Sequence, residues 1–231
     1  MYKNLTAVIL AGGQGTRLRP YTSVLPKPLV PVNGKPILEI IINQLKKNKF
    51  KNIIICLNEK NNLIKVYFGD GSKFGVKISY VYEKKPLSTM GPLKLLRKIP
   101  KNFLVMNGDI LTDLNFLNFF KSHLTSQKIF SVAVKSILYK VDYGILEFKK
   151  KKLKGFLEKP TFNYHVSMGI YVASKGLTKF IPKNKFYGFD NLMKSMIQNK
   201  IDINIFESKK SWLDIGRPED YIKANKIYKL I

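Results

Sequence analysis

The sequence has little cysteine, little histidine and little acidic charge, and each shortage excludes a class of protein. Cys56 is the single cysteine, so no internal disulfide framework exists. The apolar residues around Cys56 predict a buried strand thiol instead. His123 and His165 are too few and too far apart for a histidine-based metal site. No apolar stretch reaches the ~20 residues that span a bilayer, and the first apolar run is too short for a signal peptide. We therefore expect a cytoplasmic protein without a membrane partner.

The shortage of acidic residues leaves a large positive charge. The chain has 41 Lys and Arg against 15 Asp and Glu, which gives a formal net charge of +26. Such a charge raises nucleic acid as a partner. The lysines are scattered through every segment, however, which is also what codon bias in an AT-rich genome produces. The densest run, residues 149–152, lies between two apolar segments and predicts a hairpin turn. We expect no nucleic-acid partner, and a basic nucleic-acid-binding domain remains the distant alternative.

The glycine-rich stretch near the N-terminus suggests a function. The apolar run 6–10 predicts a strand, and glycines follow it at once, flanked by Arg17, Arg19 and Lys27. Glycine has no Cβ, so the backbone can turn tightly and bring its N–H groups against a ligand. Arginine can grip phosphate oxygens in a bidentate fork, and lysine adds a movable charge. The stretch therefore predicts a nucleoside triphosphate site. Its predicted nucleotide-binding residues are Leu10, Gly12, Gly13, Gly15, Thr16 and Arg17.

Two widespread glycine motifs are absent from this stretch. No Gly-Lys-Ser/Thr follows the glycines, so the Walker pattern is missing. The dinucleotide pattern G-x-G-x-x-G begins at Gly13 and meets Leu18 where its third glycine belongs. The alternative is a glycine turn that only joins a strand to a helix. The basic, proline-punctuated continuation disfavours that alternative, because a plain turn does not need it.

The order of apolar segments predicts an α/β fold. Predicted helices at 37–47 and 62–67 alternate with strands at 52–57 and 76–82, which indicates βαβ units. We expect a Rossmann-like three-layer α/β/α domain with a mainly parallel mixed sheet. An inserted β-hairpin is predicted over 142–148 and 153–157. The length suits one domain, 1–231, with a nucleotide-binding part (1–110) and a sugar-phosphate-binding part (111–231). In such a sheet the ligand crevice lies at the carboxyl ends of the strands.

A carboxylate follows the predicted strand at 102–106. This strand ends in Asn107-Gly108-Asp109, which puts Asp109 at the crevice beside the expected triphosphate. Two anions in contact need a cation between them, and Mg²⁺ prefers one or two carboxylates together with phosphate oxygens. Asp113 is predicted to be the N-cap of a helix over 115–124. Further predicted elements are a strand at 129–135, a strand at 166–172, helices at 175–181 and 188–199, a strand at 203–206 and a closing helix at 218–230.

The run from Ala11 to Pro36 resembles the signature of the sugar-phosphate nucleotidylyltransferases. That signature reads roughly (L)AGGxGTRLxPxTxxxPKPxxPVxGKP, and its tail is present here as residues 31–36. Members of the family join a sugar 1-phosphate to a nucleoside triphosphate and release pyrophosphate. Further matches extend the likeness over nearly the whole chain. The resemblance thus implies a nucleotidyltransferase that binds these two substrates and uses Mg²⁺.

On the nucleotide side, the resemblance implies several further roles. Residues 86–91 are similar to the P-L-G-T-x-G segment that holds the base, with Ser88 in place of the usual glycine and Thr89 next to it. Residues 212–218 match W-x-D-[IV]-G-x-P, which makes Asp214 the second magnesium ligand beside Asp109. Asn107 is implied as a nucleotide contact. The implied catalytic residues are Arg17, Lys27 and Asp109.

On the sugar side, the resemblance rests on two shorter segments. Glu158-Lys159-Pro160 matches the family's E-K-P, in which the glutamate accepts from sugar hydroxyls and the lysine pairs with the 1-phosphate. Gly144 would approach the sugar closely, and Lys27 would also draw in the sugar phosphate. Ser167 stands where the family's N-x-G-x-Y segment has asparagine. An isolated Glu-Lys-Pro is usually a surface turn, and its place after the hairpin is what favours a site.

The nucleotide base is inferred from Glu83, at the end of the third strand. A carboxylate only accepts hydrogen bonds, so it suits the N–H edge of guanine, uracil or thymine. We favour GTP because guanine offers two adjacent donors to one carboxylate, and UTP or dTTP is the alternative. The product would supply activated sugar for surface glycans, made by a monomer or homodimer. A cytidylyltransferase for a non-sugar phosphate and a binding protein without turnover are further alternatives.

Overall fold

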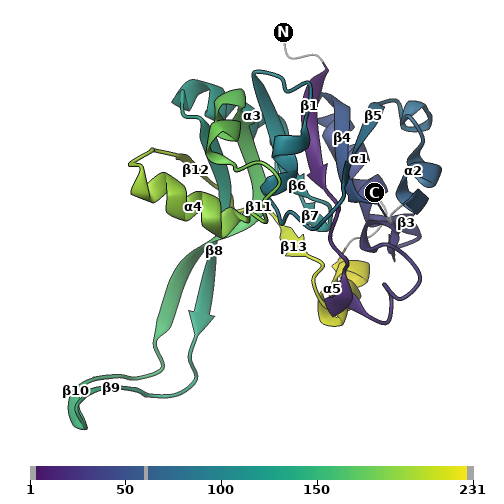
Figure 1. Ribbon diagram of the computed structural model, residues 1–231. Coiled ribbons are helices and arrows are strands. Elements are labelled where there is room, and N and C mark those ends of the chain that lie inside the picture. The colour runs from purple at the N-terminus through teal and green to yellow at the C-terminus, as the bar shows by residue number, and fades with distance from the viewer. Residues whose placement is uncertain (1–3, 60–61, 228–231) are drawn as a thin grey trace.

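The computed structural model describes residues 4–59 and 62–227, and its centre is a seven-stranded sheet (Figure 1). The strands lie in the order β12-β8-β11-β6-β1-β4-β5. Their bounds are Asn204–Glu207, Phe130–Lys140, Thr161–Ser174, Asn102–Asn107, Leu5–Leu10, Phe50–Asn58 and Lys77–Glu83, in that order. Only β11 is antiparallel to its neighbours, β6 and β8, while the other neighbouring strands pair in parallel. The predicted mainly parallel mixed sheet is confirmed.

Helices cover both faces of the sheet. On one face, α1 (Ile37–Lys47), α2 (Asn62–Phe68) and α3 (Phe116–Ser126) pack on side chains such as Ile9 and Met106. On the other face, α4 (Phe189–Gln198) packs on neighbours such as Val8 and Val105. Adjacent strand residues point to opposite faces, so strands buried on both sides appear as continuous apolar runs. The predicted three-layer architecture is confirmed.

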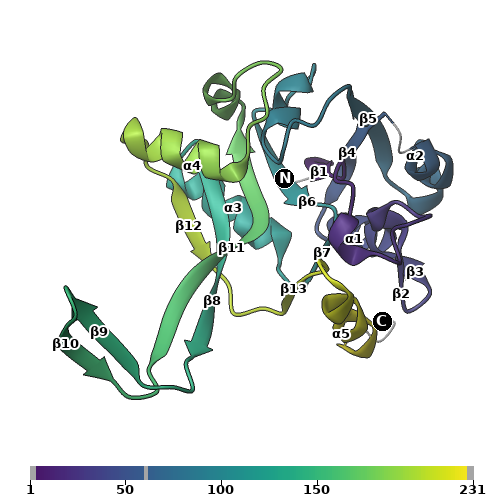
Figure 2. The same ribbon diagram turned by 60° about the horizontal axis from the view of Figure 1, so that its bottom comes forward.

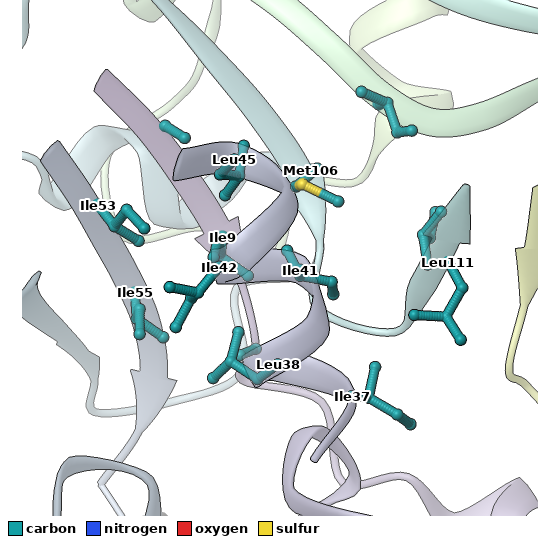
Figure 3. Packing of buried hydrophobic residues seen from close by; sticks show 14 of the residues in the cluster. Ile9, Ile37, Leu38, Ile41, Ile42, Leu45, Ile53, Ile55, Met106 and Leu111 are labelled. Atoms are coloured by element: carbon teal, nitrogen blue, oxygen red, sulfur yellow. The ribbon is translucent and has the colours of Figure 1, made fainter. Parts of the chain in front are cut away.

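Helix α1 shows why the sequence folds this way. Its apolar residues recur at helical spacing, and all of them are at least partly buried, with five fully so: Ile37, Leu38, Ile41, Ile42 and Leu45. Figure 3 shows this row facing Ile9 of β1 and Ile53 and Ile55 of β4. Burying each such side chain stabilises the fold by roughly 1.5–3 kcal/mol. The helix thereby anchors β1, whose last residue leads into the glycine loop.

The structure corrects the predicted start of α3. Asp113 is not its N-cap, because the side chain of Asn115 accepts from the backbone N–H of Asn118 at 2.9 Å. Asp113 instead accepts from the hydroxyl of Ser211, and its N–H donates to the Ser211 carbonyl at 3.2 Å. The short pairing of β7 (Ile110–Thr112) with β13 (Trp212–Asp214) brings Ser211 there. Sequence spacing carried no sign of this pairing.

Other predicted elements need smaller changes. The segment predicted as a helix at 175–181 is a 3-10 helix, Lys175–Phe180. Helix α5 is described over Pro218–Ile227, so the predicted end at residue 230 lies outside the described residues. Cys56 is buried in β4, as predicted. Among the described helices, none is long and apolar enough to cross a membrane.

The paired strands β8 and β11 run beyond the sheet as an arm (Figures 1 and 2). We define the arm as residues 136–165. Its tip is the predicted hairpin, formed by β9 (Ile145–Lys149) and β10 (Lys152–Leu157), with lysines in the turn. The register pairs Phe148 with Leu153 and Leu146 with Phe156, and all four side chains are exposed. The chain connectivity makes β8 parallel to β1, so the arm leaves the sheet at the edge where the glycine loop lies.

One histidine is buried beneath the sheet. His123 is 1% exposed, with Nδ1 2.7 Å from the Ser131 hydroxyl oxygen and Nε2 3.1 Å from that of Ser174. Burial disfavours the charged ring and lowers the pKa of His123 from its ordinary 6.5 to about 4. Between these values the unfolded chain binds more protons than the folded one. The contribution of His123 to stability is therefore complete above pH 6.5 and is lost as the pH falls toward 4.

We predict that His123→Gln makes the melting temperature less dependent on pH between about 6.5 and 4.5. The variant still has hydrogen-bonding groups, but it lacks the proton uptake that destabilises the wild type on acidification. Thermal unfolding monitored by circular dichroism across this pH range measures the effect. His165→Gln, which removes an exposed histidine, is the matched control and should retain the wild-type slope. Equal slopes for His123→Gln and wild type would contradict the assignment.

Candidate active site

A cavity of about 700 Å³ lies where four strands of the sheet end. It is lined by the last residues of β1, β4, β5 and β6, which are Leu10, Asn58, Glu83 and Asn107. The crevice is therefore at the carboxyl edge of the parallel strands, as predicted. The structure brings most of the predicted nucleotide and metal residues to it. They are Leu10, Gly12, Gly13, Arg17, Lys27, Glu83, Ser88, Thr89, Asn107, Asp109 and Asp214.

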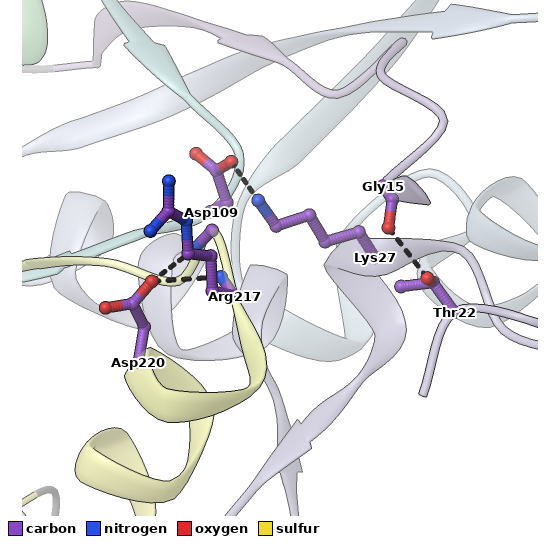
Figure 4. A network of polar contacts seen from close by, with 7 residues as sticks. Gly15, Thr22, Lys27, Asp109, Arg217 and Asp220 are labelled. Atoms are coloured by element: carbon purple, nitrogen blue, oxygen red, sulfur yellow. Dashed lines mark hydrogen bonds and ion pairs between the residues drawn. The ribbon is translucent and has the colours of Figure 1, made fainter. Parts of the chain in front are cut away.

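Two glycines of the loop have structural reasons to be glycine. A Cβ on Gly12 would lie 2.5 Å from a carboxylate oxygen of Glu83, so a larger residue would collide there. Gly15 has φ +66°, and its carbonyl accepts from the Thr22 hydroxyl at 2.7 Å (Figure 4). Gly15 and its neighbour Thr16 do not line the cavity. Their place in the structure is the turn that sends the chain on toward Lys27.

Two carboxylates meet at one end of the cavity. The Lys27 ammonium lies 2.5 Å from Oδ2 of Asp109 (Figure 4), and both side chains are largely shielded from solvent. The pairing of β13 with β7 puts Asp214 opposite Ile110, next to Asp109 in the chain. Burial raises the pKa of Asp214, and the neighbouring Asp109 charge raises it further, while Lys27 and Arg17 act in the opposite direction. The cluster therefore brings two carboxylates close enough for each to disfavour the charge of the other.

The oxygen atoms of this cluster fit a metal ion. Oδ1 of Asn107, Asp109 and Asp214 is buried, and none of the three forms a hydrogen bond with a described residue. Such oxygens are the ligands that Mg²⁺ prefers. Within residues 4–59 and 62–227, no group of three or more His, Cys, Asp and Glu side chains could hold a metal. Two carboxylates would therefore need oxygens from a substrate to complete the coordination of Mg²⁺.

Glu83 lies in the cavity wall at the end of β5. It is 7% exposed, and its Oε2 accepts from the backbone N–H of Leu87 at 3.0 Å. Burial raises the pKa of this carboxyl, whereas the Leu87 bond lowers it. The sequence prediction missed this loop-closing contact. Because one oxygen is already engaged, the two-donor contact with guanine has to compete with a backbone hydrogen bond.

The adjoining loop shows what the departure from the family pattern at Ser88 involves. This residue has φ +63°, a left-handed conformation that glycine adopts without steric cost. Ser88 thus accepts strain where the family usually has glycine. The hydroxyl of Thr89 accepts from the backbone N–H of Phe189 at 2.9 Å, which ties the loop to the start of α4. Thr89 is therefore a structural contact as well as a cavity residue.

A segment before α4 also reaches the cavity, and the sequence prediction missed it. The Tyr187 N–H donates to the Leu87 carbonyl at 3.0 Å, and the Tyr187 carbonyl accepts from the N–H groups of Met90 and Gly91 at 3.0 and 2.9 Å. This pairing puts Phe186 in the cavity wall. The paired segments are about a hundred residues apart, so no local pattern signals the contact.

The structure does not bring the predicted sugar residues to the cavity. Gly144, Glu158 and Lys159 lie on the arm, where the Lys159 ammonium is 4.0 Å from a Glu158 carboxylate oxygen and both side chains are exposed. A Cβ on Gly144 would lie 2.7 Å from the Phe156 ring, which gives this glycine a role in the hairpin itself. Ser167 lies at the base of the arm, and its hydroxyl accepts from the Gly169 N–H at 3.3 Å.

Comparisons with known proteins agree with this geometry. The model of a family described as nucleotidyl transferase matches residues 6–229. Two relatives are D-glycero-alpha-D-manno-heptose 1-phosphate guanylyltransferases. The one from Campylobacter jejuni is 35% identical, with 94% of this chain and 97% of the relative covered. The one from Aneurinibacillus thermoaerophilus is 32% identical, with 96% and 97% covered. A UTP--glucose-1-phosphate uridylyltransferase from Synechocystis is 29% identical, with 95% of this chain and 62% of the relative covered.

A solved structure adds to these relatives. The crystal structure of HddC from Yersinia pseudotuberculosis has a TM-score of 0.77 and 28% identity, with 97% of this chain and all of that chain (100%) covered. A second crystal structure of the same protein, complexed with GMP-PN, has a TM-score of 0.73 and 27% identity, with the same coverage of 97% and 100%. The similarity thus extends over almost the whole of both chains and includes one structure in complex with GMP-PN.

We predict that Mg²⁺ stabilises the wild type through Asp109 and Asp214. At roughly ten times its Kd, a ligand specific for the folded state should raise the melting temperature by about 3–5 °C. Asp109→Asn and Asp214→Asn should each reduce this shift, because an amide is a poorer ligand than a carboxylate. Thermal unfolding with and without Mg²⁺ measures it. Asp113→Asn, a nearby carboxylate outside the cavity, should retain the shift. A full shift in both cavity variants would contradict the metal assignment.

Proposed function

The chain belongs to the nucleotidyl transferase family, and on that premise we propose that it is a sugar-1-phosphate nucleotidylyltransferase that uses GTP. The proposed reaction joins GTP and a sugar 1-phosphate into a GDP-sugar and pyrophosphate. One observation carries the proposal: a single cavity combines a glycine loop and Arg17 with Lys27 and the carboxylates of Asp109 and Asp214. These are groups for holding and aligning phosphates, and the relatives are named for substrates of this kind.

The physical task in this reaction is to bring one phosphate anion against another. An oxygen of the sugar 1-phosphate attacks the α-phosphorus in line, a P–O bond forms, and the bond to pyrophosphate breaks. Arg17 and the loop amides would hold the β- and γ-phosphates and stabilise the leaving charge. Mg²⁺, held by Asp109 and Asp214, would supply positive charge to the phosphate oxygens. Lys27 would draw in the attacking phosphate.

The attacking oxygen is already ionised, so this chemistry needs no general base. The positions of the histidines are compatible with that. His123 is buried and bonded to Ser131, and His165 lies on the arm opposite Glu207 at 3.8 Å. Positioning and charge neutralisation would therefore supply the rate enhancement.

The acceptor side of the proposal involves the arm. Glu158 and Lys159 remain predicted contacts for the sugar hydroxyls and the 1-phosphate, with Gly144 and Ser167 beside the sugar. Because the arm holds the first two away from the cavity, contact requires the arm to bend toward the carboxyl edge of the sheet. The arm starts at that same edge, so the required movement is a bend and not a change of fold.

The proposal of GTP is supported chiefly by the relatives. Two of them at 32% and 35% identity are guanylyltransferases, and HddC is known in complex with GMP-PN. UTP is the second candidate, because the uridylyltransferase from Synechocystis matches almost the whole chain at 29% identity. The carboxylate of Glu83 would accept from the N–H edge of either base. Heptose and hexose 1-phosphates are the proposed acceptors, and the product would serve surface glycan synthesis in the cytoplasm.

The experiment that tests this function is a pyrophosphate-release assay over a panel of nucleotides. ATP, GTP, CTP, UTP and dTTP are each combined with a panel of hexose and heptose 1-phosphates in Mg²⁺. We expect turnover with GTP and at least one of these acceptors, and a higher KM for GTP in Glu83→Gln. Efficient turnover with CTP or ATP that is unaffected by Glu83→Gln would overturn the base assignment. No pyrophosphate release with any pair would overturn the function.

We predict that Arg17→Ala lowers kcat by at least ~10²-fold, the typical effect of losing a contact to transition-state charge. Arg17 lines the cavity, whereas Arg19 is an exposed arginine of the same loop that does not. Arg19→Ala is therefore the matched control and should retain a kcat close to that of the wild type. Steady-state kinetics with the preferred substrate pair measure both. A near-wild-type kcat for Arg17→Ala, or equal losses in the two variants, would contradict the assignment.

A further inference from the structure

One aromatic side chain is held exposed at the cavity. Among the described residues that line the cavity, Phe186 is the only aromatic one, and it is 70% exposed. Its neighbours in the chain behave differently, because Tyr187 and Phe189 pack against the buried cluster beneath α4. Phe189 also stacks on the buried Tyr171 with ring centroids 5.0 Å apart. The fold therefore packs the other aromatic side chains of this segment inward and leaves Phe186 at the cavity wall.

The backbone next to Phe186 is held by hydrogen bonds. Tyr187 exchanges hydrogen bonds with the loop at Leu87, Met90 and Gly91, at 3.0, 3.0 and 2.9 Å. Gly91 allows this close approach, because a Cβ there would lie 2.8 Å from the Leu87 Cβ and 3.1 Å from the Lys185 carbonyl oxygen. A side chain presented from such a fixed segment loses little conformational freedom when a ligand covers it. Phe186 is thus a preorganised apolar surface.

The topology indicates which substrate Phe186 faces. The base end of the cavity is formed by Glu83 and Leu87, which follow the edge strand β5. Phe186 comes from the other side, between β11 and α4, and α4 packs on Tyr171 of β11 and Val132 of β8. In the sheet order, β11 and β8 lie beyond β6, away from β5. Phe186 therefore reaches the cavity from the half of the chain in which the acceptor is expected.

We propose that Phe186 is a specificity-determining residue whose ring covers the C–H face of the acceptor's pyranose. The face of an aromatic ring is electron-rich, and the C–H groups on one side of a pyranose present a flat apolar surface to it. Ligand sites combine apolar walls of this kind with a few polar groups that set orientation. A pyranose 1-phosphate is then favoured over an acyclic polyol phosphate, which has no such face. This inference rests on the proposed function.

The first test separates the KM values of the two substrates. Phe186→Ala should raise the KM for the sugar 1-phosphate by about five- to tenfold, as expected for loss of an aromatic contact, and leave the KM for GTP unchanged. Phe186→Tyr, which retains the ring, should behave like the wild type. Ile197→Ala removes a side chain that is 77% exposed at the far end of α4 and serves as the matched control. Circular dichroism checks that each variant is folded.

The outcomes of this test are distinct. A rise in the KM for GTP, and not for the sugar, would show that Phe186 stacks on the base and would overturn the proposal. Unchanged KM values would also overturn it and leave the proposed function standing. Absence of pyrophosphate release from the wild type with every sugar phosphate would instead be a failure of the proposed function.

A binding measurement provides a readout independent of turnover. The Phe186→Trp variant carries an indole in the cavity wall, and the wild type, with Trp212 as its only tryptophan, supplies the background emission. Mannose 1-phosphate and glucose 1-phosphate should change the emission of the introduced indole in the presence of a non-hydrolysable GTP analogue, whereas glycerol 3-phosphate and inorganic phosphate should not. An equal change with all of these phosphates would indicate recognition of the phosphate alone and would contradict a platform for the sugar ring.

Discussion

Two neighbouring carboxylates beside one lysine are the constraint on which the site depends. Lys27 forms an ion pair with Asp109 at 2.5 Å, and Asp214 keeps a buried oxygen that no described residue satisfies. Burial raises the pKa of Asp214, because a partly desolvated charge is costly without a partner. One ammonium does not balance two carboxylates. This arrangement favours a cation between the carboxylates and the phosphates that the glycine loop and Arg17 are suited to hold.

The fold brings these groups together through strand ends and one short pairing. Asp109 follows β6, and Lys27 follows the glycine loop after β1, so neighbouring parallel strands place both at one edge. Asp214 reaches them because β13 pairs with β7 and because the Ile215 N–H donates to the Asp109 carbonyl at 3.0 Å. The Trp212 indole N–H, which donates to the Met168 carbonyl at 2.9 Å, fixes the same segment against β11.

The two substrate sides are built differently. The nucleotide side is preformed, with Glu83 packed on Gly12 and bonded to Leu87. The predicted acceptor contacts Glu158 and Lys159 lie instead on an exposed arm, and Phe186 is the acceptor-side group already in the cavity wall. An isolated two-stranded hairpin is marginally stable in water, so the arm is the part of the described chain most suited to move when substrates bind.

Local sequence determined the α/β order, the glycine loop, and the place of Asp109 after a buried strand, because apolar periodicity and glycine act over a few residues. The long signature also marked Arg17, Lys27 and Asp214 without any coordinates. Tertiary structure decided the rest. It put Asn115, not Asp113, at the start of α3, engaged Glu83 with Leu87, carried Gly144, Glu158 and Lys159 out on the arm, and brought Phe186 to the cavity. Each of these outcomes depends on contacts between segments distant in sequence or on how far paired strands extend, and such contacts leave no periodic pattern along the chain.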